Sequence, residues 1–156
     1  MNTDTDRMRQ AVGVIVRKEY MQPSPDGDLM KIDSILMLRR SANETSMHGL
    51  WELPGGKVEG NESIWSTATN ELQEETGLNS KIYTMVDFTH ETYNKEYYFA
   101  VANHDGDLHD VTLSDEHDAY AWMTVQEILE RPRDKISHHL IELIRHFEQM
   151  KFILMV

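Results

Sequence analysis

Hydrophobic positions with two different periods divide the chain into predicted strands and helices. Residues 11–20 (AVGVIVRKEY) and 31–40 (KIDSILMLRR) are rich in β-branched and aliphatic side chains, which predicts two strands. Residues 21–30 contain two prolines and a glycine, so they predict a loop or the tip of a hairpin. Residues 41–49 are polar and predict a turn.

The central part of the chain predicts one helix between shorter extended segments. Residues 49–56 (GLWELPGG) predict an extended piece that ends in a glycine turn, and a helix is expected over about residues 62–76. Residues 81–93 and 95–105 predict two strands that pair in antiparallel fashion. Residues 111–123 predict a loop that leads into another short strand.

The C-terminal part predicts two more helices. Thr124 and Glu127 have the spacing of a capping box that opens a short helix. Residues 135–151 predict an amphipathic helix. The apolar side of this helix consists of Ile136, Leu140, Ile141, Leu143, Ile144 and Phe147. The last five residues, FILMV, predict a packed strand or tail, with a dimer contact as the alternative. This order of elements predicts an α/β fold in which a mixed sheet is sandwiched between helices.

Composition limits the class of protein. With 156 residues, 40% of them hydrophobic and 27% charged, the chain fits a single globular domain over residues 1–156, and the polar residues 1–10 are expected to be flexible. The absence of cysteine excludes disulfides, thiolate metal sites and a cysteine nucleophile. No apolar run approaches the roughly 18 residues of a membrane helix, and the polar start lacks the apolar region of a secretory signal. We therefore expect a cytoplasmic protein without a membrane partner.

The net charge limits the partners. A formal charge of −12 argues against nucleic acid as a partner, because such a surface needs basic patches that displace counterions. The same charge does not exclude a small polyphosphate, since metal ions and a few arginines can reverse the local sign of the potential.

Three carboxylates fall within one turn of the helix expected over residues 62–76. Glu71, Glu74 and Glu75 would repel one another and raise each other's pKa unless a cation neutralised them. Oxygen ligands at this density suit a hard divalent ion such as Mg²⁺ or Mn²⁺. The sequence therefore predicts a metal site on this helix.

The periodicity of the same helix supports a buried position for two of these carboxylates. Ile64 and Ala68 define its inward stripe, and Glu71 and Glu75 lie within about 20° of the edges of that stripe. Unpaired carboxylates are costly to bury, so an ion in a cleft would be needed to compensate them. The alternative is a solvated acidic face.

The segment that starts at Gly56 resembles the Nudix box, Gly-x5-Glu-x7-Arg-Glu-U-x-Glu-Glu-x-Gly-U, in which U is a bulky aliphatic residue. The matching positions are Gly56, Glu62, Glu71, Leu72, Glu74, Glu75, Gly77 and Leu78. The preceding residues 51–56 (WELPGG) are similar to the usual approach to this box. Asn70 replaces the arginine that in the family pairs with a box glutamate, and asparagine offers neither charge nor a bidentate fork.

The resemblance implies the fold, the reaction and the residue roles. It implies a Nudix-type α/β/α sandwich that hydrolyses a nucleoside diphosphate linked to a further group. Glu71, Glu74 and Glu75 would hold Mg²⁺ or Mn²⁺ with the carbonyl of Gly55, and Glu62 would have a structural or metal-tuning role. Glu71, or a carboxylate from a later loop, is implied as general base for the attacking water.

Three residues outside the box complete the implied site. Glu116 matches in context a downstream loop glutamate that many members use as a base or as an extra ligand, and the alternative for it is plain surface. Arg39 and Arg40 resemble arginines that contact substrate phosphate in several relatives, with a solvated strand end as the alternative.

The substrate is less narrowly indicated. Compact length and the WELPGG approach are similar to MutT-like nucleoside triphosphate pyrophosphohydrolases, including those that act on oxidised nucleotides. ADP-ribose, nucleotide-sugar and dinucleoside polyphosphate hydrolases are the alternatives, and Tyr93 stands where some dinucleoside polyphosphate hydrolases have a tyrosine. A catalytically weak, ligand-binding Nudix domain is a second alternative, favoured only by Asn70. A homodimer is compatible with the sequence.

Other sites are not predicted. The eight histidines lack zinc-site spacing, and the adjacent His138 and His139 are expected to point in different directions from a helix. Lys57 follows the two glycines but precedes Val58, so the segment is not a phosphate-binding P-loop. A Gly-x-Ser-x-Gly nucleophile elbow is absent from the sequence.

Overall fold

A computed structural model describes residues 9–44 and 46–154, so residues 1–8 of the predicted flexible segment lie outside the described part. The strands are β1 (Arg9–Pro23), β2 (Leu29–Arg40), β3 (Trp51–Glu52), β4 (Gly55–Lys57), β5 (Ile82–Met85), β6 (His90–Thr92), β7 (Lys95–Asn103) and β8 (His117–Met123). The helices are α1 (Ile64–Thr76), α2 (Val125–Glu130) and α3 (His138–Leu154), with a 3-10 turn at Arg133–Lys135.

All eight strands join one mixed sheet with β1 at its centre. The order along the main path is β3-β2-β1-β7-β5, while β4, β6 and β8 pair with β1, β7 and β2. Strand β1 is antiparallel to β2 and β4 but parallel to β7, over a register that runs from Arg9 opposite Lys95 to Arg17 opposite Asn103. The predicted antiparallel neighbours are confirmed, although residues 81–93 form two short strands, β5 and β6, which both pair with β7.

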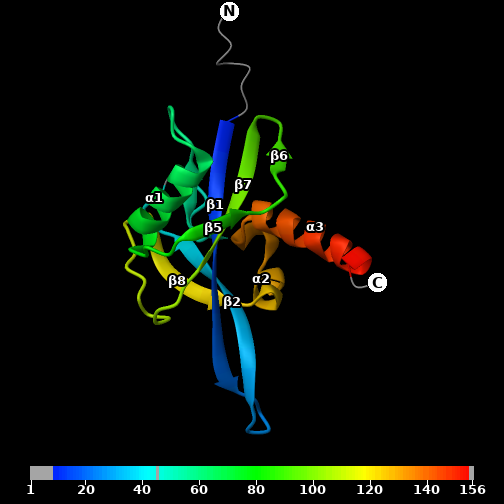
Figure 1. Ribbon diagram of the computed structural model, residues 1–156. Helices are drawn as coiled ribbons and strands as arrows, with labels where there is room; N and C mark the ends of the chain where they lie inside the picture. The colour runs from blue at the N-terminus through cyan, green and yellow to red at the C-terminus, as the bar shows by residue number, and fades with distance from the viewer. Residues whose placement is uncertain (1–8, 45, 155–156) are drawn as a thin grey trace, which may run out of the picture.

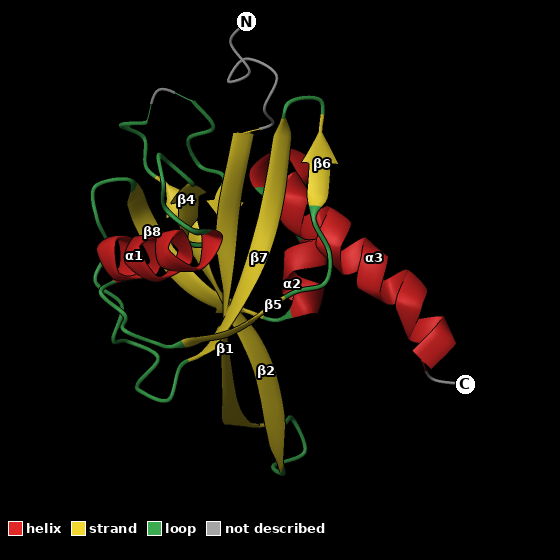
Figure 2. Cartoon of the chain, turned by 45° about the horizontal axis from the view of Figure 1, so that its top comes forward, coloured by secondary structure: helices red, strands yellow, loops and turns green. Residues whose placement is uncertain are grey.

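Alternating side chains give the sheet two apolar faces, because successive residues of a strand point to opposite sides. In β1, Val14 belongs to the cluster that packs on Ala68 of α1, whereas its neighbour Ile15 belongs to the cluster that contains Leu140 of α3. Figure 2 shows α1 on one side of the sheet and α2 with α3 on the other. The predicted α/β fold, with a mixed sheet between helices, is confirmed.

Strands β1 and β2 form a long hairpin that extends beyond the rest of the molecule (Figure 1). Its last pair is Pro23 opposite Leu29. In the connecting turn, the N–H of Ser24 donates to the carbonyl of Asp28, and the N–H of Gly27 donates to the carbonyl of Ser24. The predicted hairpin is therefore present, with a shorter loop than the composition of residues 21–30 suggests.

Helix α1 has well-defined ends. The hydroxyl of Ser63 accepts a hydrogen bond from the backbone N–H of Ser66, which satisfies one of the donors left free at a helix start. Gly77 ends the helix in the left-handed conformation, with φ of 72°, and its N–H donates to the carbonyl of Gln73. The helix expected over residues 62–76 thus begins two residues later than predicted, because Ser63 is its cap.

The C-terminal helix corrects two predictions. Helix α3 begins at His138 rather than at residue 135, because Arg133–Lys135 forms a separate 3-10 turn. Phe147 is 44% exposed instead of lying on the buried face. The helix continues through Leu154, so residues 152–154 of the predicted strand or tail are helical, and residues 155–156 lie outside the described part.

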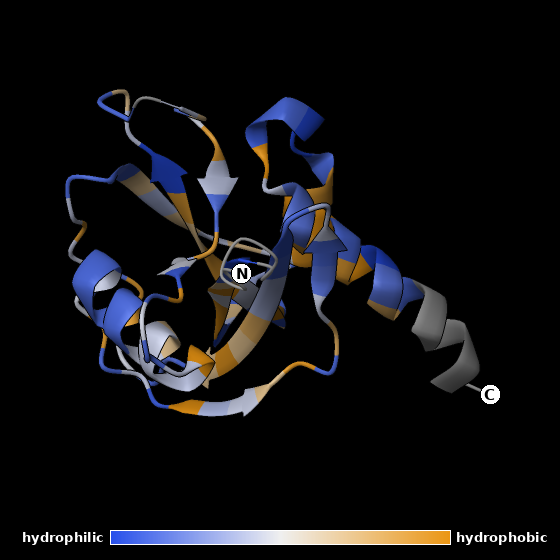
Figure 3. Cartoon of the chain, turned by 90° about the horizontal axis from the view of Figure 1, so that it is seen from above, coloured by the Kyte–Doolittle hydropathy of each residue, from blue (hydrophilic) through white to orange (hydrophobic). Residues whose placement is uncertain are grey.

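The helical surfaces that face away from the sheet are largely hydrophilic. Figure 3 shows α1 and α3 on opposite sides of the sheet, with polar residues on their outer surfaces. Within the residues that the structure describes, no helix is both long enough and apolar enough to span a bilayer.

Candidate active site

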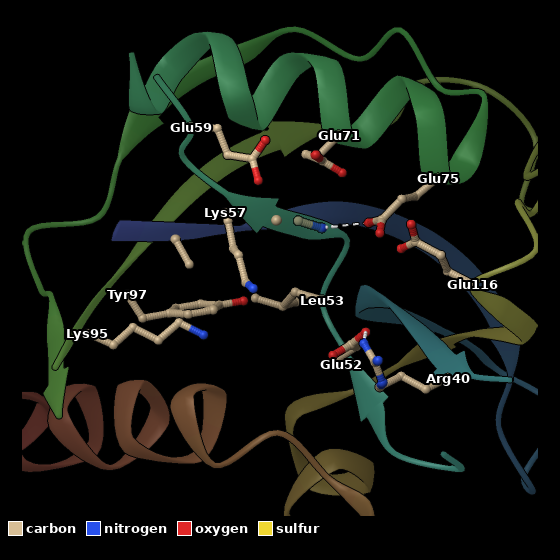
Figure 4. A pocket seen from close by; sticks show the side chains of 13 residues that line it. Arg40, Glu52, Leu53, Lys57, Glu59, Glu71, Glu75, Lys95, Tyr97 and Glu116 are labelled. Carbon is tan, nitrogen blue, oxygen red and sulfur yellow. Dashed lines mark hydrogen bonds and ion pairs between the residues drawn. The ribbon is translucent and has the colours of Figure 1, made fainter. Parts of the chain in front are cut away.

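A cavity of about 380 Å³ lies between α1, β4 and the loop that precedes β8. Figure 4 shows side chains from several elements pointing into it. Five of its lining residues are glutamates, and three are lysine or arginine. The lining residues are Ala11, Arg40, Glu52, Leu53, Gly55, Gly56, Lys57, Glu59, Glu71, Glu75, Lys95, Tyr97 and Glu116.

Helix α1 presents two of its predicted carboxylates to this cavity. Glu75 is only 4% exposed, and Glu71 is partly buried on the same side of the helix. The backbone N–H of Gly55 donates a 2.7 Å hydrogen bond to Oε1 of Glu75. The inward stripe that starts with Ala68 therefore continues as carboxylates at the cavity, as the helical periodicity predicts.

These carboxylates resist ionisation without a cation. Burial is the largest cause that raises the pKa of Glu75 to about 10, followed by the neighbouring side chain of Glu116, while the Gly55 N–H acts in the opposite direction. Burial also raises the pKa of Glu71 to about 7, followed by repulsion from Glu74 and Glu116. A donor set of carboxylate oxygens that cannot all ionise unaided fits a hard divalent ion.

A second observation points to an ion at the same end of the cavity. One ligand atom from each of Glu75, Glu116 and His117 lies within 4.8 Å of the others. Nε2 of His117 lies 2.9 Å from Oε2 of Glu52, while its buried Nδ1 has no hydrogen-bond partner. The predicted loop glutamate Glu116 thus lies beside the helical carboxylates rather than on remote surface.

The cationic side chains of the cavity come from three different strands. Arg40 ends β2 and forms ion pairs with Glu44 at 3.4 Å and Glu52 at 3.3 Å, which orient its guanidinium. Lys57 ends β4 and Lys95 begins β7. Figure 4 shows both lysines on the same side of the cavity as Tyr97. Together they place positive charge next to the acidic cluster.

Five positions singled out by the sequence lie outside the cavity lining. Glu74 is exposed on α1, although its charge contributes to the raised pKa of Glu71. Glu62 is exposed just before α1, and Asn70 is exposed on it. Arg39 pairs with Asp118 through a 2.7 Å contact and lies over the ring of Trp51. Tyr93 is fully exposed in the turn between β6 and β7.

Sequence reasoning missed several lining residues, namely Glu52, Lys57, Glu59 and Lys95. Lys57 had a usable signal, because it directly follows the Gly55–Gly56 turn. Lys95 had none, because only the pairing of β7 with β1 brings it to the cavity.

Gly55 and Gly56, at the start of the box, allow a close approach of three elements. A Cβ atom on Gly56 would lie 2.7 Å from Cδ of Glu71, whereas one on Gly55 would overlap the backbone carbonyl of Val12 in β1. Gly56 therefore leaves space for a cavity carboxylate, and Gly55 lets β4 pack directly on β1.

The comparison with known families agrees with this geometry. The family described as the NUDIX domain matches residues 8–147. The chain belongs to the Nudix family. Relatives named as pyrophosphohydrolases assign this Nudix chain to the hydrolases of diphosphate bonds, as the resemblance of the box predicts.

Relatives and solved structures support the assignment. CTP pyrophosphohydrolase of Escherichia coli (strain K12) is 29% identical over 114 residues, which cover 73% of the Nudix chain and 84% of that relative. ADP-ribose pyrophosphatase of Methanocaldococcus jannaschii is 35% identical over 69 residues, covering 43% of the chain and 40% of the relative. The MutT protein of Methanosarcina mazei Go1 has a TM-score of 0.67 at 26% identity, with 93% and 96% of the two chains covered.

Other relatives are longer than the Nudix chain. It spans 31% of Nudix hydrolase 8 of Arabidopsis thaliana, with 30% identity over 117 residues.

Proposed function

We propose that this Nudix chain is a Mg²⁺- or Mn²⁺-dependent pyrophosphohydrolase that cleaves nucleoside triphosphates, including oxidised ones. The observation that carries the proposal is the convergence of Glu71, Glu75 and Glu116 on one cavity that also contains three cationic side chains. The preference for a triphosphate is supported by the CTP pyrophosphohydrolase relative, because the match covers most of that protein.

The proposed ion would be held by oxygen atoms of Glu71, Glu75 and Glu116, together with the carbonyl of Gly55. Glu74 would add negative charge beside Glu71. A divalent ion bound there would offset the charge of the diphosphate and lower the pKa of a coordinated water.

Glu71 is the proposed general base for the attacking water, with Glu116 as the alternative. A general base must lie within reach of the water that it deprotonates, and Glu71 points into the cavity beside the proposed ion. Glu116 lies at the same end of the cavity and already shares a hydrogen bond with Glu75. Either carboxylate would accept a proton as water attacks one phosphorus in line with the departing phosphate.

The phosphate chain is proposed to contact Arg40, Lys57 and Lys95. Their charges would stabilise the negative charge that develops on the leaving phosphate. Arg40 also lines a neighbouring cavity of about 490 Å³ that contains Trp51. The guanidinium groups of Arg39 and Arg131 lie 5.8 Å and 5.4 Å from the ring centroid of Trp51. This neighbouring cavity is the proposed position of the nucleoside.

A Mg²⁺-dependent screen tests the proposal, with phosphate release measured after inorganic pyrophosphatase or alkaline phosphatase has converted the products to phosphate. Its substrates should include CTP, 8-oxo-dGTP, ADP-ribose, nucleotide sugars and dinucleoside polyphosphates. We expect turnover of nucleoside triphosphates with pyrophosphate as one product, and no turnover in EDTA. Faster turnover of ADP-ribose or of a dinucleoside polyphosphate would contradict the assignment of nucleoside triphosphates as substrate and would assign that other class instead.

A weakly catalytic, ligand-binding domain is the second candidate, because Asn70 replaces the box arginine. Nucleotide binding without turnover of any substrate in the screen would favour it. The buried position of Glu75 and its bond to Gly55 are retained without that arginine, which supports the enzyme instead.

A further inference from the structure

Three histidines converge on the face of the sheet opposite α1. One ring nitrogen from each of His90, His138 and His139 lies within 4.8 Å of the others. The interpretation that adjacent His138 and His139 point apart is therefore wrong. They occupy the first two positions of α3, and their ring centroids lie only 4.2 Å apart.

Backbone hydrogen bonds hold in place the two segments that carry this histidine cluster, β6 and the start of α3. His90 lies in β6 and pairs with Tyr97 of β7. The start of α3 is fixed to β3, because the N–H of Ser137 donates a 2.8 Å hydrogen bond to the carbonyl of Trp51. The imidazoles thus meet between two elements that are each anchored to the sheet, which reduces the reorganisation needed to bind a ligand.

The ring nitrogens face one another at short range. Nδ1 of His90 lies 2.8 Å from Nδ1 of His139, so a single proton can serve both. Two imidazoles bound to one tetrahedral zinc ion place their nitrogens roughly 3.3 Å apart, given bonds of about 2.0 Å. An ion can therefore replace the shared proton after a small rotation of the two rings.

The surroundings hold the cluster on one side and leave it open on the other. The ring of His139 stacks on Tyr97 with centroids 4.3 Å apart and an interplanar angle of 5°. His138 is exposed, which leaves access for an ion and for a water as a further ligand. Glu142 lies one turn after His138 and acts electrostatically on His90, whereas Lys95 acts with the opposite sign on His139.

We propose that His90, His138 and His139 form a binding site for a transition-metal ion of the Zn²⁺ class, distinct from the acidic cavity. Three neutral imidazoles suit Zn²⁺, Ni²⁺ or Cu²⁺, whereas the carboxylate oxygens of the acidic cavity suit Mg²⁺ or Mn²⁺. The bound ion joins the β6–β7 hairpin to the start of α3. The proposal concerns a second site, so it stands or falls separately from the proposed hydrolase activity.

Zinc binding by the full chain tests this site. Zn²⁺ is titrated in competition with a chromophoric chelator, in millimolar Mg²⁺ that occupies the acidic cavity. The variants are His138→Ala, which removes an exposed ring, and His90→Gln. The matched controls are His48→Ala, an exposed histidine elsewhere, and Glu75→Gln in the acidic cavity.

We expect one tight Zn²⁺ per chain, weakened by at least about 10-fold in His138→Ala and in His90→Gln but retained in both controls. A parallel measurement of imidazole ¹⁵N shifts should show three histidines responding to Zn²⁺, which also identifies the ligands if a variant is poorly folded. Unchanged affinity in both histidine variants, loss of binding in Glu75→Gln, or no response of the three rings would overturn the proposal.

Discussion

The backbone N–H of Gly55 and the carboxylate of Glu75 are joined by a 2.7 Å hydrogen bond that connects β4 to α1. This contact fixes the most buried box carboxylate at the wall of the cavity. The same hydrogen bond joins the glycine turn to the helix. It therefore holds both parts of the segment over residues 55–78 in a fixed arrangement.

Replacing Glu75 with glutamine should abolish turnover while the fold is kept. Glutamine keeps the shape and can still accept the Gly55 hydrogen bond, but it removes the charge that would bind the ion. We expect kcat to fall at least about 100-fold, measured as Mg²⁺-dependent phosphate release, with an unchanged circular dichroism spectrum. The exposed Glu148→Gln serves as control, and near-normal activity in Glu75→Gln would remove this residue from the metal site.

Stability should depend on pH and Mg²⁺ together. The pKa of Glu75 is raised from 4.5 to about 10 in the fold, so the folded state binds this proton more tightly than the unfolded chain. In EDTA its contribution is complete below pH 4.5 and falls as pH rises towards 10, so the fold becomes less stable over this range.

Mg²⁺ favours the ionised carboxylate, so the rise in Tm that it causes should grow with pH. Thermal melts with EDTA or Mg²⁺ across this range measure the effect. Glu75→Gln should lose the pH slope above pH 7, where Glu71 no longer contributes, together with most of the dependence on Mg²⁺. An equal Mg²⁺ effect at low and high pH would contradict the prediction.

Glu116→Gln should lower kcat with little change in KM, because the side chain acts at the reacting end of the cavity. We expect a loss of about 100-fold if Glu116 accepts the proton. Its neighbour Asp115 is exposed, so Asp115→Asn is a matched control for the charge of the loop. A wild-type rate in Glu116→Gln would leave Glu71 as the base.

Asn70→Arg should raise the rate severalfold. Position 70 is exposed and lies one turn before Glu74, so an arginine fits there and can pair with that carboxylate. Steady-state kinetics at saturating Mg²⁺ measure the effect, and Asn70→Gln controls for side-chain length without charge. An unchanged or lower rate would mean that the site is adapted to asparagine.

Alanine at the two glycines should separate activity from stability. Gly56→Ala displaces the flexible side chain of Glu71, so we expect a loss of activity of about 10- to 100-fold with a small change in Tm. Gly55→Ala meets the β1 backbone and should destabilise the fold by about 2 kcal/mol. Urea unfolding and phosphate release distinguish the two, and equal effects on both properties would contradict this assignment.

Much of the fold could be predicted from periodicity and capping, because each of these patterns lies within a single helix or strand. The carboxylates at Glu71 and Glu75 interrupt the apolar stripe of α1, and Gly77 marks its end, so periodicity and capping located the helix and its acidic face. The capping box at Thr124 is likewise present, with both of its hydrogen bonds.

Features that depend on pairing between distant segments could not be predicted. Lys95 and Tyr97 reach the cavity through the parallel register of β7 with β1, and the histidine cluster needs both β6 and the start of α3. The turn before α3 could not be predicted either. The apolar spacing of the helix continues through Ile136, but the residues just before Ile136 form a separate 3-10 turn.

The parallel pairing of β1 with β7 has a consequence for synthesis of the chain. Residue 9 finds its partner only when residue 95 has been made, because β1 and β7 are joined from Arg9 opposite Lys95 onward. Closing so long a loop slows folding relative to local contacts. The acidic helix is therefore translated well before the sheet on which it rests is complete, and an N-terminal fragment that stops short of β7 should leave the ribosome unfolded.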